Sequence, residues 1–284
     1  MTLPWFPIAL AGVVAIAATV AIERLGGRLG GVLGTLPTTI VPASLGLAAV
    51  GSDASVRDAL ATVPVGMLLN AGFLYLWRVV PARLPDTTLT VRLAAMTAIS
   101  LLAWAIGAFA VVQLEAPLTA VGLTPAWQGV IASAVLMGAG LVACRDLPPA
   151  PKGKRKVAIP TLLMRGALAA AAIATALILS QVAGPVAAGM ASVFPAIFLT
   201  AMASLWLSQG EAVPLGAVGP MMLGSSAVSV YALIGAVTLP LLGAGGGATA
   251  AWVLSVVGIS VPAAMLLARK RDGVPTSASP TATR

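Results

Sequence analysis

The side chains that most often carry protein chemistry are scarce in this sequence of 284 residues. It has no histidine, the side chain that most often binds metals and transfers protons near neutral pH. Its one cysteine, Cys144, cannot form an intrachain disulfide. The 8 acidic residues lie at the ends of apolar stretches and none lies in the middle of one. We therefore predict that the protein is not an enzyme and binds no metal and no cofactor.

The residues left for binding are mostly uncharged and gather around two prolines inside apolar stretches. A proline removes a backbone donor and frees a carbonyl, and such backbone is tolerated in lipid only when buried or lining a cavity. Asn70 is the strongest polar candidate, because an unpaired amide in hydrocarbon is costly. We predict a substrate-binding site from these residues: Thr35, Pro37, Thr38, Asn70, Ser192, Phe194, Pro195, Ser225 and Ser229.

These residues also have a purely structural interpretation, which the sequence leaves open. Gly27 and Gly31 are four residues apart, a spacing that suits close helix packing. Asn70 can bond to a neighbouring helix, and serines commonly bond to the backbone of their own helix. Packing and binding are compatible, so the proline-containing helices can serve both.

Two acidic residues occupy matching places in the two halves of the chain. Asp53 and Glu211 each follow a proline-containing stretch, which suggests a gating role on opposite faces of the membrane. The alternative is ordinary solvation at a helix end, with Glu211 close to the positive N-terminus of the next helix.

The elements that position these residues are long apolar stretches. The chain is 59% hydrophobic and 8% charged, whereas soluble domains carry about a quarter charged residues. A stretch of about 20 apolar residues spans a bilayer as a helix, and the alternation of a β-barrel is missing. We predict an all-α polytopic transmembrane bundle of nine helices at 4–22, 29–50, 59–79, 91–113, 126–144, 159–180, 186–207, 212–236 and 249–268.

Basic residues predict the orientation of these helices. With nine helices, every basic group in short loops and at helix ends falls on one side except Arg57, and positive charge marks the cytoplasmic side. We predict a multi-pass protein of the bacterial inner (plasma) membrane with its N-terminus outside and its C-terminus in the cytoplasm. The net charge of +8 therefore sets orientation and indicates no nucleic-acid partner.

The chain matches itself when it is shifted by 158 residues, which places Pro37 on Pro195, Asp53 on Glu211 and Gly66 on Gly224. The match predicts a first repeat of five helices at 1–144, a cytoplasmic basic loop at 145–158, a second repeat of four helices at 159–270 and a disordered tail at 271–284. Because five is odd, the second repeat is inverted, as in many secondary transporters. Coincidence in a chain rich in Ala, Gly and Leu is the alternative.

The helix number and the inverted five-helix unit resemble small bacterial secondary transporters of the drug/metabolite type. The glycine-rich helix with a central proline is also similar to the short GlpM-like membrane proteins. The paired interruption at Pro37 and Pro195, with few charges nearby, predicts a carrier or exporter of a small, largely apolar or amphiphilic solute that works by alternating access. The expected partners are the lipid bilayer, that small-molecule solute and, as an option, a second copy in a homodimer.

A different class of function is equally consistent with the shortage of polar groups. The chain would then be a non-transporting membrane subunit or scaffold of a larger complex. Co-purification with a stable partner would favour this alternative over a carrier.

Overall fold

The computed structural model describes residues 4–25, 36–145, 159–209 and 212–272. Every regular element in these ranges is a helix, and none is a strand, which confirms the all-α class for this part of the chain. Four predicted features lie wholly or mostly outside the described residues: Thr35, Glu211, the basic loop at 145–158 and the tail at 271–284.

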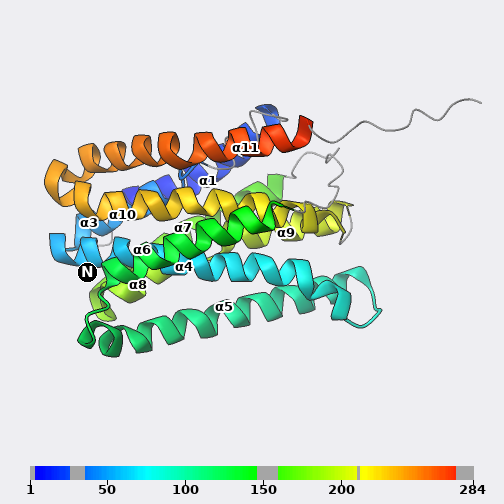
Figure 1. Cartoon of the computed structure of the whole chain (residues 1–284), viewed down its shortest axis with the longest axis horizontal. Coiled ribbons are helices and arrows are strands. Elements are labelled where there is room, and N and C mark those ends of the chain that lie inside the picture. The colour runs from blue at the N-terminus through cyan, green and yellow to red at the C-terminus, as the bar shows by residue number, and fades with distance from the viewer. Residues whose placement is uncertain (1–3, 26–35, 146–158, 210–211, 273–284) are drawn as a thin grey trace, which may run out of the picture.

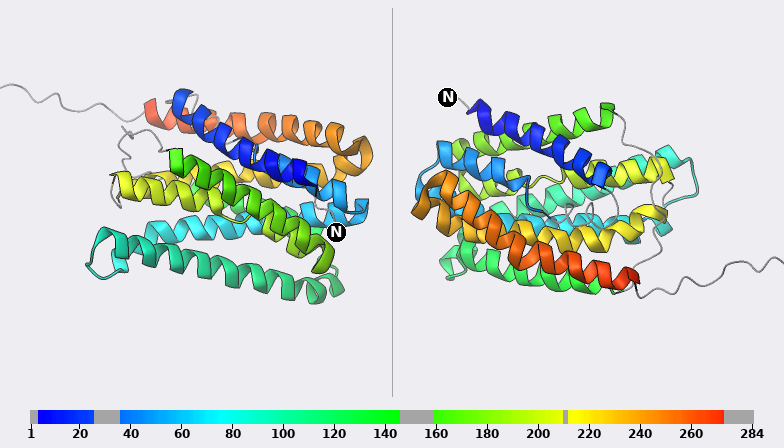
Figure 2. Two further views of the ribbon diagram at one scale, coloured as in Figure 1. Left: turned by 180° about the vertical axis from the view of Figure 1, so that it is seen from behind. Right: turned by 90° about the horizontal axis from the view of Figure 1, so that it is seen from above.

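The helices lie side by side along the long axis of the molecule (Figures 1 and 2). In chain order the elements are α1 (Trp5–Leu25), α3 (Ile40–Val50), α4 (Asp53–Val79), a 3-10 turn (Pro81–Arg83), α5 (Leu89–Ala120), α6 (Pro125–Ala143), α7 (Ile159–Val182), α8 (Gly184–Ser192), α9 (Ala196–Gln209), α10 (Ala212–Ser255), a π-helical turn (Val256–Ser260) and α11 (Val261–Asp272).

Six helical stretches in the described chain are long and apolar enough to cross a membrane. They are Asp53–Val79, Leu89–Ala120, Pro125–Ala143, Ile159–Val182, Gly184–Leu207 and Gly216–Arg269. The protein therefore has the composition and helix lengths of a multi-pass membrane protein.

The longest of these stretches folds back on itself at Gly243. Gly216–Arg269 has 54 residues, whereas one crossing needs about 20. Gly243 has the positive φ of 72°, which glycine adopts without strain. Two contacts join the segments before and after Gly243. The Thr238 hydroxyl donates to the Gly247 carbonyl at 2.9 Å, and Gly247 packs on the backbone of Leu239. We refer below to Ala212–Leu242 and Ala244–Ser255 as the first and second arms of α10.

Helix α4 begins six residues earlier than the predicted helix at 59–79. The Ser52 hydroxyl accepts the Ser55 backbone N–H at 3.3 Å and caps the helix. Asp53 then lies in the first turn, where its negative charge faces the positive end of the helix. Asp53 follows α3, as expected, and it is also the first residue of α4.

Helix α6 packs against both α4 and α10, which also pack against each other, and its opposite face is exposed. Glycines allow this contact: an added Cβ at Gly129 would collide with the Ala61 carbonyl oxygen, and one at Gly140 would lie 2.8 Å from the Leu223 Cα. An added Cβ at Gly219 of α10 would lie 2.6 Å from the Ala143 oxygen. The three helices thus meet backbone to backbone, a packing typical of membrane helices.

Helix α5 lies at one side of the bundle (Figure 1) and leaves a long apolar face uncovered by the described chain. Large side chains are exposed on α5 and also on α6: Ile99, Leu102, Ile106 and Phe109 on α5, and Trp127, Ile131 and Val135 on α6. A continuous apolar surface of this length is what a lipid-facing helix presents.

Candidate functional site

The chain between α8 and α9 is a short non-helical break at Val193–Pro195. Pro195 has no backbone N–H, so it cannot bond to the Ala191 carbonyl four residues earlier. That carbonyl instead accepts the Phe194 N–H at 3.1 Å, and the Ala196 N–H donates to the Phe194 carbonyl at 2.7 Å across Pro195. Helix α9 starts immediately after this three-residue turn.

A turn of the same kind surrounds Pro37, within the helix predicted at 29–50, of which the structure describes residues 36–50. The Thr38 N–H donates to the Leu36 carbonyl at 2.9 Å across Pro37, and α3 starts two residues later at Ile40. Both prolines are buried. The two turns use the same hydrogen bond around prolines 158 residues apart. At Pro195 the predicted helix is broken into α8 and α9, whereas the residues before the Pro37 turn lie outside the described chain.

Asn70 of α4 bonds to the break between α8 and α9. Its amide Nδ2 donates to the Val193 carbonyl at 2.8 Å and to the Met67 sulfur at 3.5 Å. The side chain is 1% exposed, and its Oδ1 accepts no hydrogen bond. The predicted importance of Asn70 thus has a structural basis, because it satisfies a carbonyl that lies outside the regular helix.

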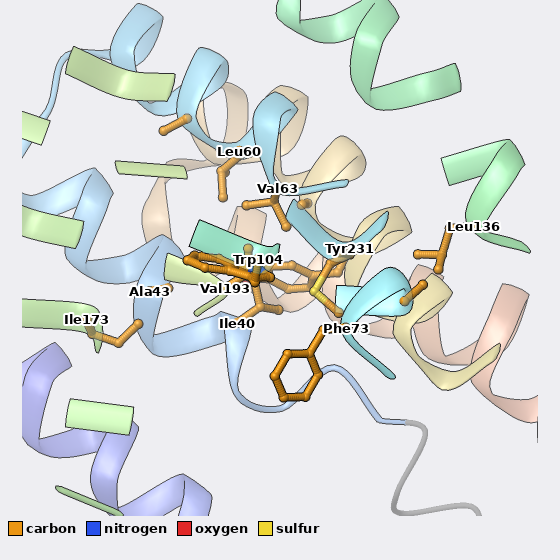
Figure 3. Close-up of a cluster of buried hydrophobic side chains, with 14 of the residues drawn as sticks. Ile40, Ala43, Leu60, Val63, Phe73, Trp104, Leu136, Ile173, Val193 and Tyr231 are labelled. Carbon is orange, nitrogen blue, oxygen red and sulfur yellow. The ribbon is translucent and has the colours of Figure 1, made fainter. Parts of the chain in front are cut away.

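Trp104 of α5 packs against the next residue of the same break, Phe194, whose side chain remains 36% exposed. Its ring meets the ring of Phe194 edge to face, with centroids 5.4 Å apart and planes at 88°. Trp104 is buried and its indole Nε1–H has no acceptor. Figure 3 shows Trp104 and Val193 in the buried cluster that also contains Tyr231 and Phe73.

A second polar contact joins α3, which follows the Pro37 turn, to the first arm of α10. Ser44 Oγ and Tyr231 OH are 2.6 Å apart and buried. Because the Ser44 hydroxyl donates to the Val41 carbonyl at 2.8 Å, the Tyr231 hydroxyl is the donor to Ser44. Each proline-containing segment is therefore bonded to a helix from the other half of the chain.

Three predicted serines use their hydroxyls within their own helices. Ser192 donates to the Gly189 carbonyl at 2.7 Å, Ser225 to the Met221 carbonyl at 2.8 Å and Ser229 to the Ser225 carbonyl at 3.5 Å. These three hydroxyls therefore fit the structural interpretation, in which serines bond to the backbone of their own helix. The neighbouring Ser226 is buried and its hydroxyl has no partner.

The structure thus brings Asn70, Phe194 and Pro195 to one place and puts Pro37 and Thr38 in the other turn. Asp53 is exposed at the start of α4, away from the buried groups of either turn. In the part of the chain that the structure describes, no three His, Cys, Asp or Glu side chains group closely enough to hold a metal ion.

Sequence reasoning missed the contributions of Trp104, Ser44 and Tyr231. Their signal was present: a Trp or Tyr in the middle of an apolar stretch has a polar group that needs a partner when buried. Trp104 is the one tryptophan that falls in the middle of a predicted helix.

Comparisons with known proteins add no relative: no known protein family, curated protein or solved structure matches the chain.

The Ser44–Tyr231 contact yields a testable prediction. Tyr231→Phe removes the buried donor and is expected to destabilise the protein by about 1 kcal/mol. Ser44→Ala should cost a similar amount, and the double variant should cost less than the sum because both changes remove one bond. Thermal unfolding in detergent measures all three, with the exposed Tyr75→Phe as a control that leaves the midpoint unchanged. Strictly additive effects would contradict a direct bond.

Proposed function

We propose that the chain is an integral membrane carrier or exporter of a small, largely apolar or amphiphilic solute that works by alternating access. The observation that carries the proposal is the pair of matching turns around the buried prolines Pro37 and Pro195. The break at Pro195 bonds to α4 through Asn70, and α3, which follows the Pro37 turn, bonds to α10 through Ser44 and Tyr231. Discontinuous helices of this kind form the substrate sites of many secondary transporters.

An inverted repeat accounts for the order of the helices. A shift of 158 residues places α1 on α7, α3 on α9 and α4 on the first arm of α10. It places α5 on the second arm, the π-helical turn and α11. Counting both arms separately, and α8 with α9 as one crossing, the proposal assigns nine crossings to the whole chain. Its N-terminus lies outside and its C-terminus in the cytoplasm of a bacterial inner membrane.

The position of α6 suggests a division that differs from five plus four helices. Near one end, Gly129 meets Ala61 of α4, and near the other end Ala143 meets Gly219 of α10. Gly219 lies 158 residues after Ala61, so α6 contacts equivalent positions of the two units at its opposite ends. We infer that α6 belongs to neither repeat and lies across their pseudo-twofold axis, which makes the architecture four, one and four helices.

The hydrogen bonds of the site suggest how the units would move. Asn70 and Tyr231 each lie on the third helix of one unit, and each bonds to the broken helix of the other unit, at Val193 and Ser44 respectively. Rocking of the units about α6 would loosen these contacts on one side of the membrane at a time. Both faces would then open in turn to one central site.

Distances between spin labels test alternating access without knowledge of the solute. One label pair replaces Arg83 and Leu207, and the other replaces their repeat equivalents Leu241 and Ala49, all of which are exposed. The background is Cys144→Ala, which removes the one native cysteine. In lipid nanodiscs we expect two distance populations for each pair, with the longer one favoured at one end when the shorter one is favoured at the other.

Pro195→Ala supplies the matched perturbation, because it restores an N–H that can bond to the Ala191 carbonyl and so continue the helix. We expect it to collapse each distribution towards one population. A single narrow distance at both ends in the parent protein, unchanged by Pro195→Ala, would refute the carrier.

The packing of α4, α6 and α10 favours one alternative, a non-transporting subunit or scaffold. Backbone contacts at Gly129, Gly140 and Gly219 suit a rigid core, and the open face of α5 offers a surface for another membrane protein. A rigid scaffold predicts single label distances together with co-purification of a stable partner, so the same measurement separates the two functions.

A further inference from the structure

Two buried polar groups at the break between α8 and α9 have no hydrogen-bond partner. One is the acceptor Oδ1 of Asn70 and the other is the donor Nε1–H of Trp104. Buried polar groups are normally satisfied, and unsatisfied ones mark strain, water or a ligand. These two are complementary, because one needs a donor and the other an acceptor.

The orientation of the Asn70 amide is determined by its surroundings. Nδ2 lies 2.8 Å from the Val193 carbonyl oxygen and 3.5 Å from the Met67 sulfur, and both are acceptors. A flipped amide would place Oδ1 against the Val193 oxygen, where neither atom has a hydrogen to donate. Oδ1 is therefore the atom left for an outside donor.

Both groups belong to one place in the fold. Asn70 bonds to Val193, and Trp104 packs on Phe194, the next residue in the chain. Asn70 comes from α4 and Trp104 from α5, in the first half of the chain, whereas the break lies in the second half. The two unsatisfied groups thus lie at a junction between the proposed units, where a carrier holds its solute.

The surroundings exclude a charged ligand group. Arg165 is the one charged side chain among the described residues that is buried, and it lies in the first turns of α7 instead of at the break. A charge without a partner in an apolar interior is strongly disfavoured. The neighbours of the break are apolar: Gly66 and Met190 pack together where α4 meets Val193.

We propose that Asn70 Oδ1 and Trp104 Nε1–H bind an uncharged group that both donates and accepts a hydrogen bond, such as a primary amide or a hydroxyl, on an otherwise apolar solute. The inference rests on the proposed carrier function and specifies its substrate class. The amide or hydroxyl hydrogen bonds to Asn70, its oxygen accepts from Trp104, and the apolar part lies among the side chains around the break.

Competition binding with a matched ligand series tests this class. Tritiated nonanamide is the probe for the full-length protein in nanodiscs, with protein-free nanodiscs subtracted to remove partitioning into lipid. The competitors are 2-decanone, which only accepts, decane, which does neither, and protonated decylamine, which is charged. We expect nonanamide to bind about tenfold more tightly than 2-decanone, and decane and decylamine to compete least.

Trp104→Phe keeps the aromatic contact with Phe194 and removes only the N–H donor. We expect it to weaken nonanamide about tenfold and to abolish the advantage of 2-decanone over decane. Trp127→Phe, at an indole that is exposed on α6, is the control and should change neither. Equal competition by nonanamide and decane, or no effect of Trp104→Phe, would overturn the proposal and assign the two groups to buried water.

The ligand-binding experiment and the spin-label experiment can fail independently. If each label pair shows two distance populations but the ligand series shows no preference for the amide, the carrier proposal stands and the proposed substrate class is wrong. If nonanamide binds in a Trp104-dependent way while the distances stay fixed, the site is real and the carrier is wrong.

Discussion

Replacing Gly129 by alanine is expected to lower the free energy of unfolding by about 1–3 kcal/mol, the usual cost of overpacking a close-packed interior. The new methyl group would meet the Ala61 carbonyl oxygen of α4, which is backbone and cannot rotate away. Either α6 or α4 must therefore shift, and α6 is also held against α10 at Gly140. The midpoint of thermal unfolding in detergent measures the loss.

The same helix offers a matched control at Gly138. An added Cβ at this position meets no atom within 4 Å, so Gly138→Ala should leave the midpoint unchanged or raise it slightly through better helix propensity. Equal effects of the two substitutions would show that α6 is not seated against α4 as described. That result would also remove the support for α6 as the helix between the two units.

Much of the fold was predictable because the bilayer imposes the length of each crossing. The predicted helices at 126–144 and 159–180 agree within two residues at each end with α6 and α7. The reversal in the glycine-rich stretch at Gly243 was also predictable, because the orientation predicted from the basic residues requires two crossings in this region. Helix ends that extend beyond the apolar core were less predictable: α4 starts at Asp53 because Ser52 caps it.

The candidate site was predictable in its prolines and less so in its polar contacts. A proline interrupts its own helix, so its effect can be recognised locally. The partner of a hydroxyl depends instead on which helix lies opposite. Ser225 bonds to its own helix, whereas Ser44 bonds to its own helix and also to Tyr231, 187 residues away along the chain. Nothing in the local sequence separates these two serines, because both follow the same apolar pattern.

The two ends of the proposed repeat differ in the size of the side chains that close them. Trp77 of α4 and Trp206 of α9 are fully buried and meet edge to face, with centroids 5.7 Å apart. Their equivalents 158 residues along are Gly235 and Ala48. In the proposed orientation the two indoles lie towards the cytoplasm, so a large aromatic contact closes the inner end, whereas the equivalent positions at the outer end carry no aromatic ring.

Trp77→Ala is therefore expected to favour opening at the inner end. The edge-to-face contact contributes about 0.5–1.5 kcal/mol beyond its buried area, so its loss should raise the inward-open population about two- to tenfold. Spin labels at positions 83 and 207 should report more of the longer distance, and those at 49 and 241 more of the shorter one. Trp206→Ala should act in the same direction, because it removes the other ring of the same pair.

Loss of stability alone would not produce this pattern, and Trp127→Ala separates the two effects. Trp127 is exposed on α6, so its removal deletes an indole without touching the inner contact. We expect both label pairs to keep their parent distributions in this variant. If Trp77→Ala lowers the unfolding midpoint but changes neither distance distribution, the two tryptophans only pack a rigid core. Their asymmetry between the halves would then reflect packing in a scaffold rather than a gate.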